Sequence, residues 1–406
     1  MSEWRFTAYD LRTGSKLTDL NVASWSSTDV LNDSGDFSAT IELDGAGRST
    51  VTVVAALPLT DDDGVVLTDD LGEELLADPE PTTFPTSRRT VVADSTRRGR
   101  SVIVAERDGV PCFTGIIWRR QYDATSRTLK VAGRGLGSYF DHFSQTTALT
   151  STGIDQFAIL KGLVDFVQNQ AGANIGIEIP AATSGVLRDR VYEAFSGKKV
   201  GELMRELSNV VDGFDYDVRS EYDTGAVVRR LRRFYPRRGR TFEATGLRFR
   251  APGNAVLFDM SEDASDMATV VTALGAGDGA DMLITTAAET ALVNAGWPAY
   301  SVTRAYKDVT VLATLAQHAG ADVARLSGVD DESFSVQVDP TFPGQPWGSW
   351  DLGDDCQLIV DDDPLFPAGD DGSPGLVSNR RVAAHGWSVQ GSSEQLTVTL
   401  DRKVIP

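Results

Sequence analysis

Two short segments, one near each end of the chain, alternate apolar and polar residues with a period of two. Residues 36–43 read Asp-Phe-Ser-Ala-Thr-Ile-Glu-Leu, so every second side chain is apolar. Residues 334–338 read Phe-Ser-Val-Gln-Val and repeat the pattern. A helix needs apolar residues three and four apart, whereas this alternation is typical of an antiparallel strand with one covered face. Both ends of the chain are therefore predicted to be strand-rich, with one face of each sheet in solvent.

The two ends also resemble each other in sequence. Residues 37–41 are similar to residues 334–338. Gly115-Ile-Ile-Trp, a polar turn and Thr128-Leu-Lys-Val resemble Ala384-His-Gly-Trp-Ser-Val, a polar turn and Leu396-Thr-Val-Thr. Short strand pairs often look alike by chance, so duplication and coincidence both stay open. If the duplication is real, one chain carries two related β-barrels or sandwiches.

The middle of the chain changes to helical periodicity. Apolar residues recur at three and four, which predicts helices over 154–167, 200–211 and 309–326, with Asp308 as the N-cap of the third. Strands lie between them. The fold class expected is therefore α+β, mostly β, with two β-barrel or sandwich modules at the ends and a mixed α/β middle. The expected domains are residues 1–145 with a long acidic insertion at 58–100, read as an extended surface loop, then 146–245 with two helices, 246–330 ending in a helix, and 331–406.

Charge and composition exclude several classes of function. The 406 residues include 38 Lys and Arg against 58 Asp and Glu, a formal charge of −20. Such a balance disfavours a main surface for duplex nucleic acid or for anionic lipid. No apolar run of about 18 residues occurs, and the first residues lack an apolar signal core, so neither a membrane span nor export is expected. Two cysteines and three histidines are too few for a disulfide framework or a Cys-based metal site, and no cofactor is expected.

Several short motifs resemble catalytic or binding signatures, and each has a simpler interpretation. Residues 275–280 fit a loose dinucleotide fingerprint, but no βαβ unit surrounds them. Residues 196–199 fit Ser-x-x-Lys without its companion motifs, so Ser196 is interpreted as part of a helix start. Residues 353–355 read Gly-Asp-Asp and are interpreted as a turn. The aspartate triplets at 61–63 and 361–363 lack the spacing of a calcium loop. None of these is predicted to be a catalytic or metal site.

A run of arginines is the most unusual feature of the sequence. Seven positive charges fall within twelve residues that contain no acid. A phosphate-binding stripe, a docking surface for an acidic neighbouring chain and a solvated hairpin are all compatible with it. Docking between subunits is the hypothesis we favour. The residues concerned are Arg229, Arg230, Arg232, Arg233, Arg237, Arg238 and Arg240.

The order of the elements resembles a known family. Val104-Ala-Glu-Arg-Asp-Gly109, Phe113-Thr-Gly-Ile-Ile117 and Thr128-Leu-Lys-Val-Ala-Gly-Arg-Gly-Leu136 look like the opening of baseplate hub or tail-tip minor tail proteins of long-tailed (siphovirus) phages of actinobacteria. The segments that resemble its later parts are 199–208, 213–216, 263–277, 352–358 and 380–383. The resemblance spans nearly the whole chain, although the acidic insertion and the arginine run have no counterpart in it.

That resemblance implies a structural protein of the virion tail tip and no enzymatic activity. It implies tail-tube-like modules at both ends, and a homotrimer in which six such modules surround a channel. The protein would connect the tail tube to the tip, and its partners would be the distal tail protein, the tape measure protein and other minor tail proteins. DNA would pass through without specific binding, and the chain alone would bind no membrane. It would be made and assembled in the host cytoplasm.

Two other functions stay open. One is a tail-associated cell-wall or polysaccharide hydrolase, which would need two carboxylates across a cleft. The other is a receptor or carbohydrate-binding tail module, for which Trp347 and Trp350 are the only hint. For the hub, a wall that held phosphate would stall DNA, so we expect small polar and acidic side chains to face the channel and the arginine run to point away from it.

Overall fold

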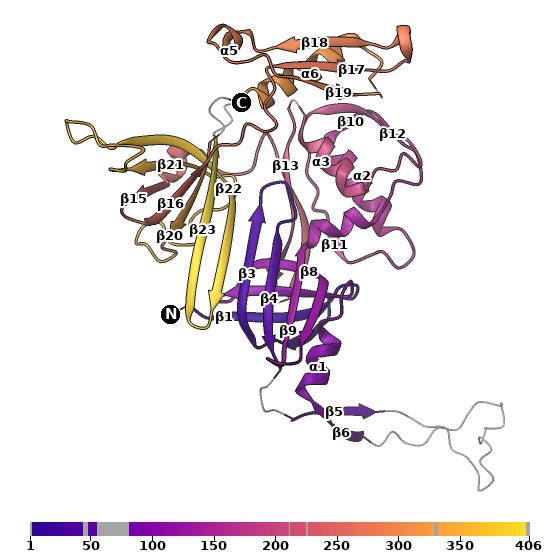
Figure 1. Ribbon diagram of the computed structural model, residues 1–406. Coiled ribbons are helices and arrows are strands. Elements are labelled where there is room, and N and C mark those ends of the chain that lie inside the picture. Colours follow the sequence, from indigo (N-terminus) through magenta and orange to yellow (C-terminus); the bar gives the residue numbers. More distant parts are fainter. Residues whose placement is uncertain are drawn as a thin grey trace, which may run out of the picture.

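A computed structural model describes residues 2–43, 48–54, 81–210, 212–224, 226–307, 309–328 and 332–402. Strands dominate, and most of the helices lie in the middle of the chain, so the expected α+β, mostly β class is confirmed (Figure 1). Asp308 and residues 58–80 of the expected acidic loop lie outside the described residues. None of the described sheets closes into a barrel.

Instead, the two ends of the chain share one 13-stranded sheet. In Figure 1 the yellow strand β22 lies beside the indigo strand β3, which joins the C-terminal module to the N-terminal one. The N-terminal module consists of β1 (Trp4–Asp10), β2 (Lys16–Asp19), β3 (Val22–Val30), β4 (Asp36–Glu42), β7 (Ser101–Arg107), β8 (Val110–Asp123) and β9 (Thr128–Gly135). The C-terminal module consists of β15 (Arg248–Ala251), β16 (Ala255–Ser261), β20 (Ser333–Val338), β21 (Asp355–Val360), β22 (Leu376–Gln390) and β23 (Ser393–Arg402).

Four strands of each module follow the same order and the same registers. The N-terminal order is β3-β4-β9-β8, and the C-terminal order is β16-β20-β23-β22. Phe37 of β4 lies opposite Gly133 of β9, as Phe334 of β20 lies opposite Leu400 of β23. The likeness of residues 37–41 and 334–338 thus has a structural counterpart at the level of single residue pairs.

Even the irregularities coincide in the two sets of strands. β8 has a one-residue bulge between Ile117 and Arg119, and β22 has one between Val382 and Ala384. The register of β3 against β4 shifts between Val22 and Ser24, and that of β16 against β20 shifts between residues 255 and 257. A bulge re-aims a strand, so coincident bulges give both modules the same curvature.

Each module buries the apolar side of its alternating strands in its own core. Because β4 alternates, Phe37, Ala39 and Ile41 all face inward, where they meet Trp25 and Phe6. The C-terminal core forms in the same way from β20, β22 and β23. Its buried members include Phe249, Phe334, Val336, Trp350, Leu358, Val382, Trp387, Leu396, Val398 and Leu400.

The middle of the chain packs its helices onto the N-terminal module. α2 (Gln156–Gln168) and α3 (Val200–Ser208) confirm the first two predicted helices, although Ile154 belongs to a strand and the Asp155 side chain caps α2. The other elements here are η1 (Leu136–His142), β10 (Leu149–Asp155), β11 (Ile177–Glu178), β12 (Leu187–Tyr192), β13 (Asp215–Asp223), β14 (Ala226–Phe234) and α4 (Phe242–Thr245).

A small α/β unit lies at the top of Figure 1. The third predicted helix is confirmed as α6 (Leu312–Leu326), which starts three residues later than expected and covers one side of a three-stranded sheet. The other elements of the unit are β17 (Val270–Leu274), η2 (Gly279–Asp281), β18 (Ile284–Ala288), α5 (Thr290–Asn294) and β19 (Ser301–Ala305).

The segment expected to be an extended loop at 58–100 is regular in its described part. β6 (Pro81–Ser87) pairs with β5 (Arg48–Val54), and α1 (Arg88–Ser95) follows directly. Val92 of α1 lies in the core of the N-terminal module, which holds the helix against the sheet. The prediction of a loop was therefore wrong for residues 81–95, because composition alone hid this pairing and this contact.

Candidate functional site

The solvent-facing side of the large sheet carries a field of uncharged residues, polar except for Gly386, which we call the neutral face. Cross-strand pairing aligns them in rows: Ser388 lies opposite Ser26, and Ser26 lies opposite Ser38. The Ser26 and Ser38 hydroxyl oxygens are 2.8 Å apart and hydrogen-bonded. The members of the neutral face are Ser24, Ser26, Thr28, Ser38, Thr40, Ser335, Gln337, Gly386, Ser388, Gln390, Gln395, Thr397 and Thr399.

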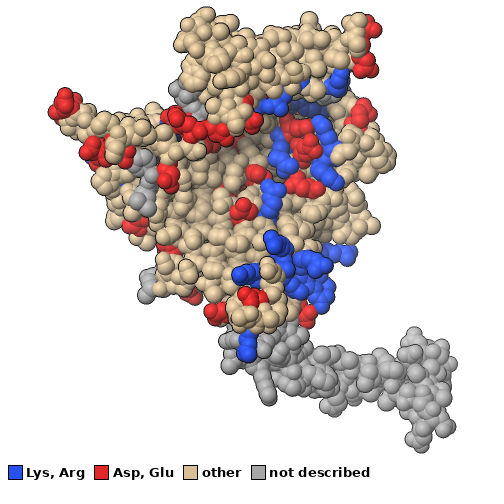
Figure 2. Space-filling view, in the orientation of Figure 1, with Lys and Arg blue, Asp and Glu red and all other residues tan. Residues whose placement is uncertain are grey.

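The neutral face crosses from one module to the other without interruption, because β22 and β3 are paired. Figure 2 shows residues that are neither acidic nor basic over most of these strands. Charged residues lie around it: Asp36 and Glu42 on β4, Lys130 and Arg134 on β9, Asp259 on β16 opposite Ser335, and Asp401 near the end of β23. The thirteen positions themselves hold no cation that could retain a phosphate, and Lys130, opposite Thr40, is a cation at one margin.

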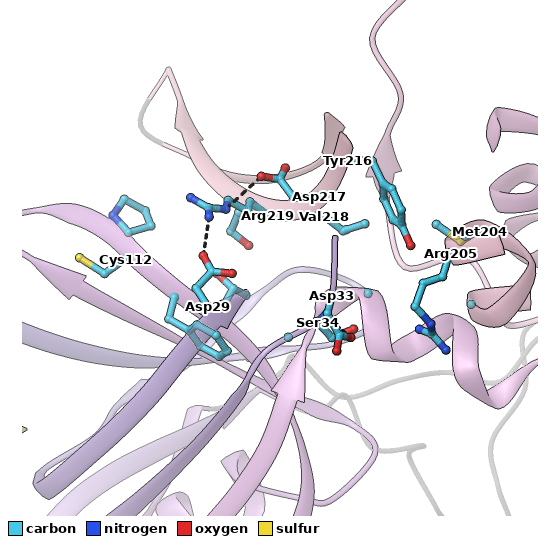
Figure 3. A pocket seen from close by; sticks show the side chains of 17 residues that line it. Asp29, Asp33, Ser34, Cys112, Met204, Arg205, Tyr216, Asp217, Val218 and Arg219 are labelled. Atoms are coloured by element: carbon cyan, nitrogen blue, oxygen red, sulfur yellow. Dashed lines mark hydrogen bonds and ion pairs between the residues drawn. The ribbon is translucent and has the colours of Figure 1, made fainter. Parts of the chain in front are cut away.

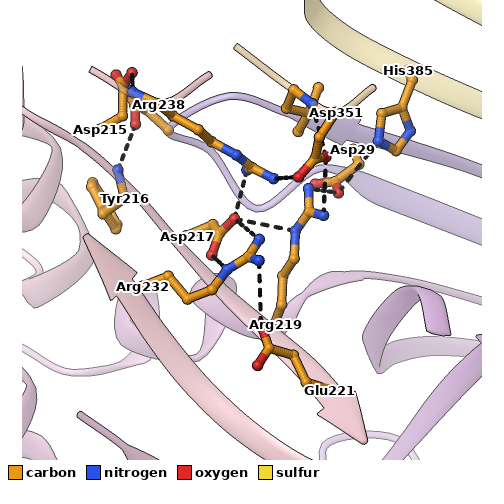
Figure 4. A network of polar contacts seen from close by, with 12 residues as sticks. Asp29, Asp215, Tyr216, Asp217, Arg219, Glu221, Arg232, Arg238, Asp351 and His385 are labelled. Atoms are coloured by element: carbon orange, nitrogen blue, oxygen red, sulfur yellow. Dashed lines mark hydrogen bonds and ion pairs between the residues drawn. The ribbon is translucent and has the colours of Figure 1, made fainter. Parts of the chain in front are cut away.

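A dense network of ion pairs lies where the two modules and the middle of the chain meet (Figure 4). The hairpin β13–β14 supplies its centre. Asp217 on β13 accepts two hydrogen bonds from Arg232, at 2.8 and 2.6 Å, and one from Arg238 at 2.5 Å. Arg219 forms an ion pair with Asp29 of β3 and lies 3.2 Å from Asp217. The N-terminal module is thereby joined to the hairpin.

The end of the arginine run joins the hairpin to the C-terminal module. Arg237 donates two hydrogen bonds to Asp355, at 2.6 and 2.8 Å, and Arg240 donates to Asp354 at 2.6 Å. Between them Gly239, at φ +93°, approaches Gly353 so closely that a Cβ would lie 2.0 Å from its backbone. Only glycine fits this approach. The Gly-Asp-Asp motif at 353–355 is therefore part of the junction.

The start of the run contacts the middle of the chain. Arg229 is buried and donates to three backbone carbonyls, of Asp10, Leu11 and Ile175. Arg230 pairs with Glu178, Glu221 and Asp223. Arg233 donates to the Phe157 carbonyl at 3.2 Å, and its guanidinium lies 5.2 Å from the centre of that ring.

All seven arginines thus have partners in the same chain, and the structure brings them together along one hairpin and the turn after it. Arg238, only 3% exposed, reaches both Asp217 and Asp351. Arg240 keeps 52% of its side chain exposed. Docking of the run onto a neighbouring chain stays a prediction. Sequence reasoning identified the unusual cations but missed their partners, because Asp351, Asp354 and Asp355 lie more than 100 residues away.

The arginines of the junction keep its aspartate side chains ionised. Burial by itself would raise the pKa of Asp217, but Arg232, Arg219 and Arg238 outweigh it and hold that pKa below its usual range. The pKa of Asp351 is lowered for the same reason by Arg219 and Arg238. A carboxylate in such a network loses a proton readily and keeps its ion pairs across the neutral pH range.

One histidine inside the junction stays neutral. His385 is fully buried, and burial lowers its pKa to about 4, although Asp29 acts in the opposite direction. Its Nε2 lies 3.9 Å from an Asp29 oxygen, and neither ring nitrogen has a hydrogen-bond partner among the described residues. The ring packs edge-on against Trp347. It therefore acts as part of the core.

A small cavity lies beside this network, between β13, α3 and the N-terminal module (Figure 3). Its volume is about 40 Å³, enough for about two or three waters. Cys112 lines it, and burial raises the pKa of that thiol to about 11, so the thiol is not a nucleophile at neutral pH. Tyr216 and Arg219 line it as well. The cavity is too small for a substrate.

The other candidate sites have structural roles. Trp350 is 4% exposed and packs against Phe249 and Trp347, so these tryptophans form part of the C-terminal core. An open groove of about 340 Å³ beside Trp350 is lined by arginines of the run and their aspartates. Within the described ranges no cluster of His, Cys, Asp and Glu could hold a metal ion. No helix there is long and apolar enough to cross a membrane.

Comparison with protein-family models finds no match, and comparison with curated proteins finds none either. Solved structures of similar fold do exist. A tail protein from Neisseria meningitidis MC58 superimposes with a TM-score of 0.56 at 14% identity, over 98% of this chain and 97% of that one. A 43 kDa tail protein of prophage MuSo2 from Shewanella oneidensis gives 0.57 at 12% identity, over 98% of each chain. The chain shares the fold of these tail proteins along its whole length.

Proposed function

We propose that this chain is a structural protein of a phage tail tip, a baseplate hub that joins the tail tube to the tip and lines the channel for DNA. The observation that carries the proposal is the neutral face, which spans both modules on one sheet. The likeness in fold to two tail proteins, one of them from a prophage, supports it. The phage would be one of the long-tailed phages of actinobacteria, as the sequence resemblance suggests.

The physical argument concerns passage of DNA. Each lysine or arginine that meets a phosphate releases counterions, so a basic wall would hold DNA and slow its exit. The neutral face has no charged member among its thirteen positions. Five of the seven arginines of the run are paired with carboxylates of the same chain, and Arg229 and Arg233 donate to its backbone carbonyls. DNA can slide past such a wall without a binding site.

The assembly proposed is a homotrimer, made in the host cytoplasm, with six modules around the channel. Its neighbours would be the distal tail protein, the tape measure protein and other minor tail proteins. We propose no enzymatic activity, because the carboxylates of the junction are paired with arginines, and this includes Asp351 and Asp354 in the open groove beside Trp350.

The test changes the charge of the proposed wall. We expect Ser26→Lys, Ser388→Lys and Thr397→Lys together, introduced into the phage, to leave tail assembly intact and to slow DNA ejection severalfold, because three cations per chain would hold phosphate. The control places lysines at Ser15, Thr125 and Ser196, which are exposed elsewhere. Equal ejection rates for the two triple variants would contradict the channel role. Release of sugar or peptide from host cell walls by the pure protein would favour a hydrolase.

A further inference from the structure

The two sets of four strands differ at one edge. In the C-terminal module, β22 pairs with β21 before its bulge and with β3 after it. In the N-terminal module, β8 pairs with β7 before its bulge. At the bulge itself the Gly99 backbone N–H donates to the Ile117 carbonyl (2.7 Å), and at the equivalent position of β22 the Gly353 backbone N–H donates to the Val382 carbonyl (2.8 Å). After the bulge, residues 119–122 of β8 pair with β9 on one side. Among the described strands nothing pairs with their other side.

The opposite end of the sheet has a matching gap. β16 occupies the place in the C-terminal module that β3 occupies in the N-terminal one. One edge of β16 pairs with β20, and no described strand pairs with the other. The corresponding edge of β3 is covered by β22. Bare strand edges present unpaired N–H and C=O groups, and natural proteins rarely leave them open.

We propose that residues 119–122 of β8 in one copy pair with the end of β16 of a second copy and with the two residues that follow this strand, Glu262 and Asp263, as β22 pairs with β3 within the chain. The register follows from the internal one, in which Gly386 lies opposite Thr28 and His385 opposite Asp29. Transferred to the equivalent positions, it sets Gln121 opposite Ser261. The full set of opposed residues is Tyr122 with Met260, Gln121 with Ser261, Arg120 with Glu262, and Arg119 with Asp263.

The side chains on these edges are complementary. Arg119 and Arg120 are exposed, and neither forms an ion pair within the described part of the chain, although Arg120 donates to the Ala93 carbonyl. Glu262 and Asp263 are exposed as well. Each contact would therefore bring two positive charges to two negative ones, which offsets part of the repulsion between chains of charge −20.

Tyr122 gives independent support. It is 57% exposed, whereas Trp387, its equivalent on β22, is 2% exposed. Within the chain Trp387 lies opposite Ser27 of β3 and its ring packs against Trp4 and Trp347, whereas Tyr122 would lie opposite Met260 of a second copy. The pairing ends there, because β8 stops at Asp123, whose carboxylate accepts hydrogen bonds from its own turn at Thr125 and Ser126.

This contact uses different edges on its two sides, so it is heterologous and continues from copy to copy until a ring closes. It would leave neither edge bare. The inference rests on the proposed assembly and deepens it by naming the contact. Basic side chains also gather low on the face in Figure 2, over the N-terminal module.

A cysteine cross-link tests the register. Directly opposed residues of an antiparallel pair have Cα atoms about 4.5–5.5 Å apart, within the range of a disulfide. We expect Gln121→Cys with Ser261→Cys to give disulfide-linked dimers and trimers under mild oxidation. The control, Gln121→Cys with Asp259→Cys, shifts one partner by about 7 Å and should not cross-link. The natural Cys112 and Cys356 are buried and will not interfere.

The mass of the unoxidised variant, measured by light scattering, separates the two proposals. Trimers that do not cross-link at 121 and 261 would overturn the β8–β16 contact and leave the assembly standing. Protein that stays monomeric at all concentrations would overturn both. Trimers that cross-link equally well at the control positions would show that the register is wrong.

A charge exchange tests the ion pairs. We expect Arg119→Glu with Arg120→Glu to shift the midpoint of assembly at least tenfold to higher protein concentration. Adding Glu262→Arg and Asp263→Arg should restore it. The control, Arg12→Glu with Arg304→Glu, makes the same change in net charge at exposed positions away from the β8 edge. Equal weakening by the control, or no rescue by the exchange, would overturn the pairing, and far-UV circular dichroism shows whether each variant is folded.

Discussion

The N-terminal and C-terminal modules share strand order, register and bulges, yet equivalent positions carry different residues. Past the bulge, β22 has His385 and Trp387, both buried, where β8 has Arg120 and Tyr122, both exposed. The first edge is covered by β3 of the same chain, and no described strand pairs with the second. The comparison teaches that the residues of each edge are fitted to their surroundings, while the strand framework stays the same.

The largest expected effect is the loss of stability when Trp387 of the C-terminal module is truncated, compared with truncation of its equivalent, Tyr122, in the N-terminal module. Trp387→Ala should cost about 3–5 kcal/mol of unfolding free energy, because it empties a site between Trp4 and Trp347. Tyr122→Ala in the dilute single chain should cost less than about 0.5 kcal/mol, since its ring lies in solvent. Urea unfolding measures both. Equal losses would break the comparison, because they would mean that the β8 edge is already covered within the chain.

A second prediction compares two arginines of the run. Arg238→Ala should destabilise the chain by about 3–5 kcal/mol, because it leaves Asp217 buried without one of its partners. Arg230→Ala removes ion pairs to Glu178, Glu221 and Asp223, which all stay in contact with solvent, so it should cost much less. Thermal or urea unfolding of the two variants gives the difference. A cost for Arg230→Ala as large as that for Arg238→Ala would contradict the burial of the network.

A third prediction concerns His385, whose equivalent position in the N-terminal module is Arg120. His385 has a pKa of about 4 in the folded chain, below its usual value of 6.5. Between these values the unfolded chain binds the proton and the folded chain does not, so stability falls as the pH falls from 6.5 to 4. This contribution is on the order of 3 kcal/mol at pH 4. We expect His385→Leu to remove it and to flatten the curve of unfolding free energy against pH.

The matched control for that experiment is Arg120→Leu, the equivalent position in the N-terminal module. Arginine stays charged throughout this range, so the change should leave the slope between pH 6.5 and 4 unaltered. The paired aspartates of the junction contribute to acid sensitivity in both variants and cancel in the difference. A slope that His385→Leu leaves unchanged would show that the ring accepts a proton in the folded chain.

Much of the fold followed from local pattern. Alternation predicted β4 and β20, and three-and-four periodicity predicted α2, α3 and α6, because these patterns arise from the geometry of the single element. The prediction failed for residues 81–95, where composition suggested a loop. β6 pairs with β5, which lies on the far side of the insertion, and α1 contacts the core of the N-terminal module through Val92. A short window of sequence shows neither contact.

The sequence by itself determined the strand-rich ends, the helical middle, the net charge of −20 and the presence of seven clustered arginines. It also contained the likeness between residues 37–41 and 334–338, although chance could have produced it. Only the tertiary structure decided that the two modules share one sheet, that uncharged residues from five strands form one face, and that each arginine is met by groups of its own chain. These facts depend on which distant strands lie side by side, and contacts across hundreds of residues are set by the packing of the whole chain.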